Sequence, residues 1–290
     1  MSIKKYIQLA RLNNWTKNLI IFSPLFFSGK INDLLLLKQS IFAFISFSFL
    51  TSSIYILNDY LDLHQDRTHP LKKNRPLASG KVPISHAGAL GLLLLILGLG
   101  MMYSFFSTTT FYISLFYIVI MVSYCLVFRK IALIDIGIIA IGFVLRLYVG
   151  SSVIEIPNSN WIIIMTFLLA LFIALAKRRD DLTNPIINPL ESRESLGGYR
   201  LILVDSLINI MVPIIIVSYI LYCTAEGNVA RIGKNLFLTS VFVLFGFIRY
   251  LQLVFVKNLG GDPINLLYRD YGIQLAIILW ISSFVWILYF

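Results

Sequence analysis

Four side chains with metal-binding oxygens stand where an apolar run meets a basic loop: Asn58, Asp59, Asp62 and Asp66. On a helix, Asn58, Asp62 and Asp66 fall on one face, with Asp59 beside them. Carboxylates this close repel each other unless a cation lies between them, and oxygen ligands suit Mg²⁺. The spacing therefore predicts that Asp59, Asp62 and Asp66 are catalytic and bind Mg²⁺, or Mn²⁺. Asn58 is predicted to orient these carboxylates and to bind substrate. A solvated acidic face is the alternative.

The loop that follows, residues 67–81, supplies positive charge. Its prolines break any helix, and Gly80 allows a tight turn, so an ordered loop is expected. Arg75, next to Pro76, and Lys81 are suited to the oxygens of a pyrophosphate group. We predict Arg75 as a catalytic residue and Lys81 as a substrate-binding residue. Alternatively, the loop is basic only because of its place in the membrane topology.

A second polar cluster follows a later apolar run, from Lys177 to Asp181, and ends near Tyr199. The prediction is that Lys177, Arg178, Asp181 and Tyr199 contact substrate, with Arg178 holding a phosphate group. The alternative is an ion pair that joins Asp181 to Arg178 or Lys177.

Two further basic residues lie in or beside apolar runs. Charge inside a membrane span is expensive and usually functional, so Arg146 is a predicted substrate-binding residue. A structural partner inside the bundle is the other interpretation. Lys17, near the start of the first run, is predicted to contact a bound phosphate, with a lipid head group as the alternative.

The elements that position these residues are membrane spans. Hydrophobic residues make up 58% of the 290 residues and charged residues 13%, far from a soluble composition. Most of the apolar runs are about 18 to 22 residues long, enough to cross a bilayer as a helix. We expect an all-α integral membrane protein, one transmembrane domain over residues 1–290, with nine transmembrane helices. They are expected at residues 12–28, 39–58, 87–106, 110–128, 132–152, 160–177, 201–223, 236–256 and 271–290.

The basic residues predict the orientation of these spans. Most of the 24 Lys and Arg fall in alternate loops, and the positive-inside rule then places the N-terminus and the polar clusters in the cytoplasm. The net charge of +10 therefore requires no nucleic-acid partner and reflects a face that attracts anionic lipid and phosphorylated substrates. The two cysteines are expected at opposite ends of the bilayer, where no disulfide can join them.

The acidic motif resembles the N-D-x-x-D-x-x-x-D motif of the UbiA superfamily of intramembrane prenyltransferases, here Asn58, Asp59, Asp62 and Asp66. The downstream run from Asn74 to Leu77 and Gly80 resembles the family too, as does the pattern from Asp135 through Arg146 to Gly150. The resemblance covers nearly the whole chain. It implies a nine-helix bundle with a cytoplasm-facing cavity, in the bacterial inner membrane.

The chain departs from the family where a second D-x-x-x-D motif is usual, because it has Lys177-Arg178-Arg179-Asp180-Asp181 there. Together with residues 11–18 and 261–270, this resembles the decaprenyl-phosphate phosphoribosyltransferase branch. The resemblance implies transfer of 5-phosphoribosyl from phosphoribosyl pyrophosphate to a polyprenyl phosphate, for lipid-linked pentose in cell-envelope glycans. It leaves a homo-oligomer open.

Two other functions compete with this one. The runner-up moves a prenyl group from its diphosphate to an aromatic acceptor, so that the lipid is the electrophile. A transporter with an acidic ion site is the non-enzymatic interpretation, but transporters place their ion sites near mid-membrane, whereas these aspartates are expected at the membrane edge.

Overall fold

The computed structural model describes residues 3–70, 72–183, 194–257, 266 and 268–289, and every regular element in these residues is a helix. Asp262, part of the motif at the end of the chain, lies outside them. Eight of the described helical segments are long and apolar enough to cross a membrane. The chain divides into two compact units, one of residues 1–159 with 186–197 and one of residues 160–185 with 198–290.

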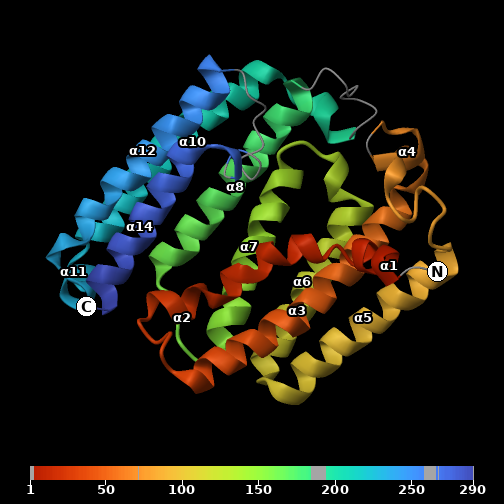
Figure 1. The fold of residues 1–290 in the computed structure, drawn as a ribbon, viewed down its shortest axis with the longest axis horizontal. Coiled ribbons are helices and arrows are strands. Elements are labelled where there is room, and N and C mark those ends of the chain that lie inside the picture. Colours follow the sequence, from red (N-terminus) through yellow and green to blue (C-terminus); the bar gives the residue numbers. More distant parts are fainter. Residues whose placement is uncertain (1–2, 71, 184–193, 258–265, 267, 290) are drawn as a thin grey trace. The chain divides into compact units, whose positions relative to one another are not determined.

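The first unit consists of the N-terminal helices, four helices of membrane length and short connecting elements (Figure 1). In chain order, from the N-terminus through the last of these four helices, its elements are α1 (Ile3–Leu9), η1 (Leu12–Phe22), α2 (Ser23–Phe27), α3 (Leu34–Leu61), α4 (Leu63–Thr68), η2 (Lys72–Asn74), α5 (Ile84–Phe105), α6 (Thr108–Leu126), η3 (Phe128–Lys130) and α7 (Ile134–Val153). The 3-10 helix η4 (Glu194–Gly198) follows much later in the chain.

Helix α3 is the core of this unit. It begins at the cap Asp33, whose carboxylate accepts from the backbone N–H groups of Leu35 and Leu36, and it packs along α5. A core of buried apolar side chains joins α3 to α6 and α7, with Phe47 and Tyr117 among them. Small hydroxyl residues of α3 are also buried, and such residues let helices approach closely within a membrane. They are Ser40, Ser46, Ser48, Thr51, Ser52 and Ser53.

The predicted first span, residues 12–28, is not a transmembrane α-helix, so the prediction of nine such helices is wrong. It consists of the 3-10 helix η1 and the short helix α2. Its polar start does not favour an apolar α-helix. The segment nevertheless follows α3 in the opposite direction. Trp15 donates to Ser52 at 2.9 Å, Asn18 donates to Ser48 at 3.0 Å, and the Phe22 ring packs on Phe44.

The second unit contains the remaining four helical segments of membrane length. Its described elements are α8 (Asn160–Thr183), α10 (Leu201–Thr224), α11 (Glu226–Ile232), η5 (Lys234–Thr239), α12 (Ser240–Leu251), η6 (Gln252–Val256) and α14 (Tyr271–Tyr289). Helix α8 packs along α10, and α12 along α14. Inside the unit Trp280 donates to the Tyr219 hydroxyl at 2.7 Å, which ties α14 to α10.

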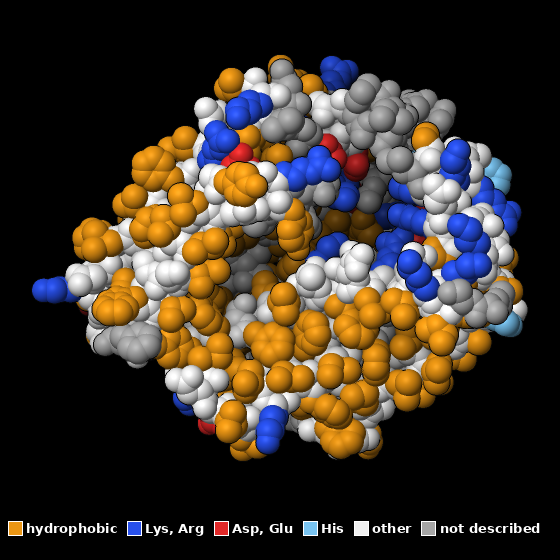
Figure 2. Space-filling view, in the orientation of Figure 1, with side chains coloured by type: hydrophobic (Ala, Val, Ile, Leu, Met, Phe, Trp, Pro, Cys, Tyr) orange, Lys and Arg blue, Asp and Glu red, His pale blue; other side chains and the backbone are white. Residues whose placement is uncertain are grey.

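The surface of the first unit separates apolar and basic side chains. Large apolar residues of α5 and α6 are exposed, among them Leu93, Ile96 and Phe116, and Figure 2 shows hydrophobic side chains over much of this unit. Lys and Arg gather instead at its α4 end, where Arg67 and Lys81 are exposed. Exposed apolar helix faces are what lipid contact requires, whereas the basic end has the charge that attracts anionic groups.

Candidate active site

The predicted acidic residues lie at the junction between α3 and α4. Asp59 is in the last turn of α3, Asp62 is the residue between the two helices, and Asp66 is in α4. The backbone of Asp62 departs from helical geometry, with φ −89° and ψ 2°. The predicted row therefore divides in two. Asn58 donates to Asp62 at 2.8 Å, whereas Asp66 shares an arginine with Asp59.

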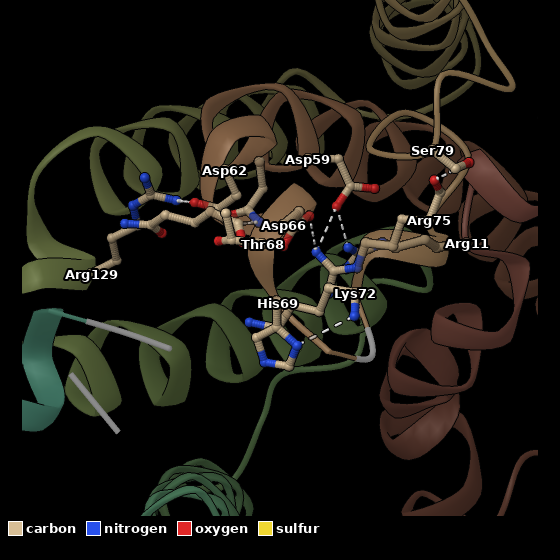
Figure 3. Close-up of polar contacts among 12 residues, drawn as sticks. Arg11, Asp59, Asp62, Asp66, Thr68, His69, Lys72, Arg75, Ser79 and Arg129 are labelled. Atoms are coloured by element: carbon tan, nitrogen blue, oxygen red, sulfur yellow. Dashed lines mark hydrogen bonds and ion pairs between the residues drawn. The ribbon is translucent and has the colours of Figure 1, made fainter. Parts of the chain in front are cut away.

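That arginine is Arg75, which the sequence placed in the site. Its Nη1 donates to Asp66 at 2.6 Å and to Asp59 at 3.1 Å (Figure 3). Both carboxylates are buried, with side chains only 3% exposed, while the arginine side chain is 28% exposed. The loop holds Arg75 in place because Leu77, two residues on, is buried in an apolar cluster with Leu9 of α1.

Two further arginines of the site were missed by the sequence reasoning. Arg11 donates to Asp59 and Arg129 donates to Asp62. Figure 3 shows both side chains directed at Asp59, Asp62 and Asp66, which together are called the acidic group. Their partners are distant in sequence, so spacing gave no signal. The only signal available was that each is a basic residue just outside an apolar run.

Arg11 has a left-handed backbone, with φ 52° and ψ 49°. This conformation is costly for a residue with a Cβ, and strain of this kind gathers at functional sites. Its guanidinium also lies over the Tyr55 ring, 5.3 Å from the ring centre. Lys17, a predicted phosphate contact, lies over the same ring with Nζ 6.0 Å from its centre. Lys17 and Arg11 therefore both contact Tyr55, which lies about one helical turn before Asp59 in α3.

The acidic group balances three carboxylates against three guanidinium groups. In the part of the chain that the structure describes, no three His, Cys, Asp or Glu side chains are already arranged around a metal position. The donors nevertheless fit a hard cation. Asp59 and Asp66 are close enough to share one positively charged nitrogen, and a divalent cation binds between carboxylates in the same way. Asp62 is half-buried beside them.

Arg146 is buried in the core of the first unit, where it bonds to neutral groups. Its guanidinium donates to Asn18 Oδ1 at 2.8 Å, to the Gly142 carbonyl at 2.7 Å and to the Tyr117 hydroxyl at 2.8 Å. These contacts join α7 to η1 and α6. They match the alternative of a structural partner inside the bundle, and substrate binding by Arg146 stays a prediction.

Lys81, the predicted substrate-binding residue of the basic loop, has an exposed side chain.

The other predicted residues belong to the second unit. Arg178 is 1% exposed and donates to Asp181 at 3.3 Å, so the ion pair weighed as an alternative is present. Lys177 is exposed on the same helix, and Tyr199 is buried just before α10. Substrate contact by these four residues stays a prediction.

Two more ion pairs in this unit involve Arg179 of the polar cluster at residues 177–181 and Asp270 of the motif at residues 261–270, neither of which is a predicted substrate-binding residue. Arg179 donates to Asp205 at 2.7 Å. Asp270 accepts from Arg249 Nη2 at 2.7 Å, and hydrogen bonding to Arg249 holds the pKa of the Asp270 carboxyl below its usual value. The first pair joins α8 to α10, and the second joins α12 to the residue before α14.

Comparison with known proteins gives a family. The model of the UbiA prenyltransferase family matches residues 20–262. A decaprenyl-phosphate phosphoribosyltransferase of Mycolicibacterium smegmatis is 27% identical over 297 residues, which cover 98% of this chain and 92% of that protein. An uncharacterised Sinorhizobium fredii protein is 27% identical over 279 residues, 92% of this chain, and the chain spans 53% of that protein.

A solved structure has the same fold. The UbiA homolog of Archaeoglobus fulgidus bound to DMAPP and Mg²⁺ aligns with a TM-score of 0.73 and 17% sequence identity, over 98% of this chain and 99% of the other. At this identity the similarity concerns the fold alone. It agrees with the expected UbiA-like fold, and that homolog holds Mg²⁺ together with a prenyl diphosphate.

Proposed function

The chain belongs to the UbiA prenyltransferase family, whose members are multi-pass membrane transferases that act on prenyl or polyprenyl substrates. We propose that it transfers a 5-phosphoribosyl group from phosphoribosyl pyrophosphate to a polyprenyl phosphate. The observation that carries the proposal is the grouping of Asp59, Asp62 and Asp66 with three arginines at one end of the first unit. The similarity to a phosphoribosyltransferase along 98% of the chain supports this donor.

The residues of the acidic group have separate roles in this proposal. Asp59, Asp62 and Asp66 hold Mg²⁺, or Mn²⁺, which supplies charge stabilisation for a departing pyrophosphate. Arg75 and Arg11 hold the pyrophosphate oxygens, since a guanidinium matches phosphate geometry with paired N–H donors. With substrate bound, both guanidinium groups would be in place before the bond breaks, so they would stabilise the negative charge that develops on the leaving group.

The reaction breaks the bond from C1 of ribose to the pyrophosphate oxygen, and the bonding electrons leave with pyrophosphate. An oxygen of the lipid phosphate forms the new bond to C1. A phosphate monoester is already ionised near neutral pH, so the attacking oxygen needs no strong general base. A site made of carboxylates paired with arginines suits this reaction better than one that must remove a proton from an acceptor.

The remaining predicted residues would hold the other phosphates. Lys17 contacts the Tyr55 ring, as Arg11 does, and Lys81 is exposed in the loop that carries Arg75, so both suit a phosphate contact. In the second unit Lys177 and Arg178 supply the positive charge for a ribose 5-phosphate or lipid phosphate, with Asp181 orienting Arg178. We further propose that the acidic group faces the cytoplasm, because the loop beside it is rich in Lys and Arg.

The test is a transfer assay on the purified protein in lipid vesicles. Radiolabelled phosphoribosyl pyrophosphate, a polyprenyl phosphate and Mg²⁺ should yield label that extracts into organic solvent. Asp62→Asn or Asp66→Asn should nearly abolish this transfer while the variant stays folded, and excess chelator should do the same. The competing function predicts the reverse, namely transfer of a prenyl group from prenyl diphosphate to 4-hydroxybenzoate and no reaction with phosphoribosyl pyrophosphate.

A further inference from the structure

One nitrogen of Arg75 lies where a cation shared by two buried carboxylates would lie. Its Nη1 is 2.6 Å from an oxygen of Asp66 and 3.1 Å from an oxygen of Asp59. A divalent cation that bridged the two carboxylates through these oxygens would take the place of Nη1. The guanidinium and the metal therefore cannot both hold their best position, because two positive charges at hydrogen-bond distance repel strongly.

We infer that Arg75 competes with the divalent cation for Asp59 and Asp66, and that a diphosphate group relieves this competition by giving Arg75 another anionic partner. The inference rests on the metal role proposed above for these aspartates. It makes metal and diphosphate binding cooperative, with Arg75 as the residue that couples them.

The charges explain the coupling. A divalent cation that binds alone displaces Arg75 from its carboxylates and leaves an unpaired guanidinium beside a dication. A diphosphate that binds alone is attracted by Arg75 but also faces the carboxylates of Asp59 and Asp66. When both bind, each carboxylate keeps a cation and the guanidinium gains a phosphate. Each ligand therefore raises the affinity for the other by the same factor.

The arginine is placed so that its side chain can turn while its backbone stays. Its side chain is 28% exposed, whereas the loop is anchored by the burial of Leu77 and by Ser79, whose hydroxyl donates to the Arg75 carbonyl at 2.7 Å. Asp59 keeps a second arginine, Arg11, so one buried carboxylate retains a partner as Arg75 leaves. Only the side chain has to move from carboxylate to phosphate.

The first experiment measures Mn²⁺ binding to the purified protein by electron paramagnetic resonance, with neither ribosyl donor nor lipid acceptor present. Arg75→Gln should bind Mn²⁺ about tenfold more tightly than the wild type, within the usual range of coupling between sites. Arg67→Gln removes the same charge from an exposed position on α4, and its affinity should match the wild type. An unchanged or weaker affinity in Arg75→Gln would overturn the inference, whereas a residue that only holds phosphate gives no tightening.

The second experiment uses the unaltered protein and so does not depend on the folding of a variant. Phenylglyoxal modifies accessible arginines, and mass spectrometry locates each modified residue. Mn²⁺ should increase the modification of Arg75 and leave Arg67 unchanged, and addition of inorganic pyrophosphate with Mn²⁺ should protect Arg75 again. If Mn²⁺ leaves Arg75 as protected as before, the inference is wrong. The transfer assay on the same preparation tests the proposed function separately, because neither measurement involves the transfer reaction.

Discussion

Arg11 combines a left-handed backbone with an ion pair to Asp59, and two substitutions separate these features. Arg11→Ala removes the guanidinium and leaves a Cβ on the left-handed backbone. Arg11→Gly removes the guanidinium too, but glycine adopts a positive φ without steric cost. The two variants therefore lose the same charge, and only Arg11→Ala keeps the strain of a Cβ on a left-handed backbone.

The expected magnitudes follow from the contacts. A hydrogen bond to a charged group contributes about 1.5–3 kcal/mol, and both variants lose the bond to Asp59. A left-handed conformation costs a residue with a Cβ about 1–2 kcal/mol, and part of the gain on replacement by glycine is offset by the greater entropy of the unfolded chain. Arg11→Gly should therefore be about 1 kcal/mol more stable than Arg11→Ala. For a chain of this length that is roughly 2 °C in Tm.

The Tm of thermal unfolding in detergent reports the effect of the strain on stability, and kcat/KM in the transfer assay reports the effect of the lost charge on activity. Both variants should lower kcat/KM by a similar factor, roughly 10-fold to 100-fold for one lost charge-assisted contact to the diphosphate. Arg11→Lys, which keeps a charge, should fall between them and the wild type in activity. A Tm for Arg11→Gly at or below that of Arg11→Ala would refute the role of strain. Full activity in both variants would refute the role of the charge.

Three other outcomes are expected. Arg178→Ala should raise the KM for phosphoribosyl pyrophosphate about tenfold, because one charge-assisted phosphate contact is lost. A transfer assay at varied donor concentration tests this, and an unchanged KM would contradict it. Tags in the 67–85 loop should react only from the cytoplasm and tags at the C-terminus only from outside, since one of the eight candidate helices precedes this loop and seven follow it. Labelling of both tags from the same side would show that a helix is misplaced. Gly150→Ala would put a Cβ 2.1 Å from the Ile21 carbonyl oxygen, whereas a Cβ at Gly137 of the same helix meets open space. The first variant should lose about 1–3 kcal/mol of stability to overpacking and the second none, and equal Tm values in detergent would count against this packing.

The apolar runs predicted the membrane helices closely, because their length alone decides whether a helix can cross a bilayer. The run predicted at 87–106 is α5 (Ile84–Phe105), and the run at 201–223 is α10 (Leu201–Thr224). The polar start of the segment at 12–28 disfavours an apolar α-helix, but composition does not identify a 3-10 helix as the alternative, since the periods of the two helices differ by less than one residue per turn. Residues 12–22 therefore form a 3-10 helix where the sequence predicts an α-helix, while Ser23–Phe27 is α-helical.

The site was predictable where its residues are close in sequence. Asp59, Asp62 and Asp66 lie within eight residues, and Arg75 follows in the next loop, so the local sequence pattern is enough to predict that they lie together. Arg11 and Arg129 lie 48 and 67 residues from the aspartates they contact. Only the packing of the helices brings them there, and a single sequence contains no record of that packing.

The 3-10 form of η1 explains how Arg11 reaches Asp59. The stretch of α3 from Phe44 to Asp59 rises about 22 Å at 1.5 Å per residue. Helix η1 has 11 residues, and at the 3-10 rise of about 2.0 Å per residue it covers the same roughly 22 Å. An α-helix of the same residues would rise only about 17 Å and would leave Arg11 about one helical turn short of its partner. The polar contacts that hold η1 against α3 therefore fix both its helical form and the position of an arginine in the candidate active site.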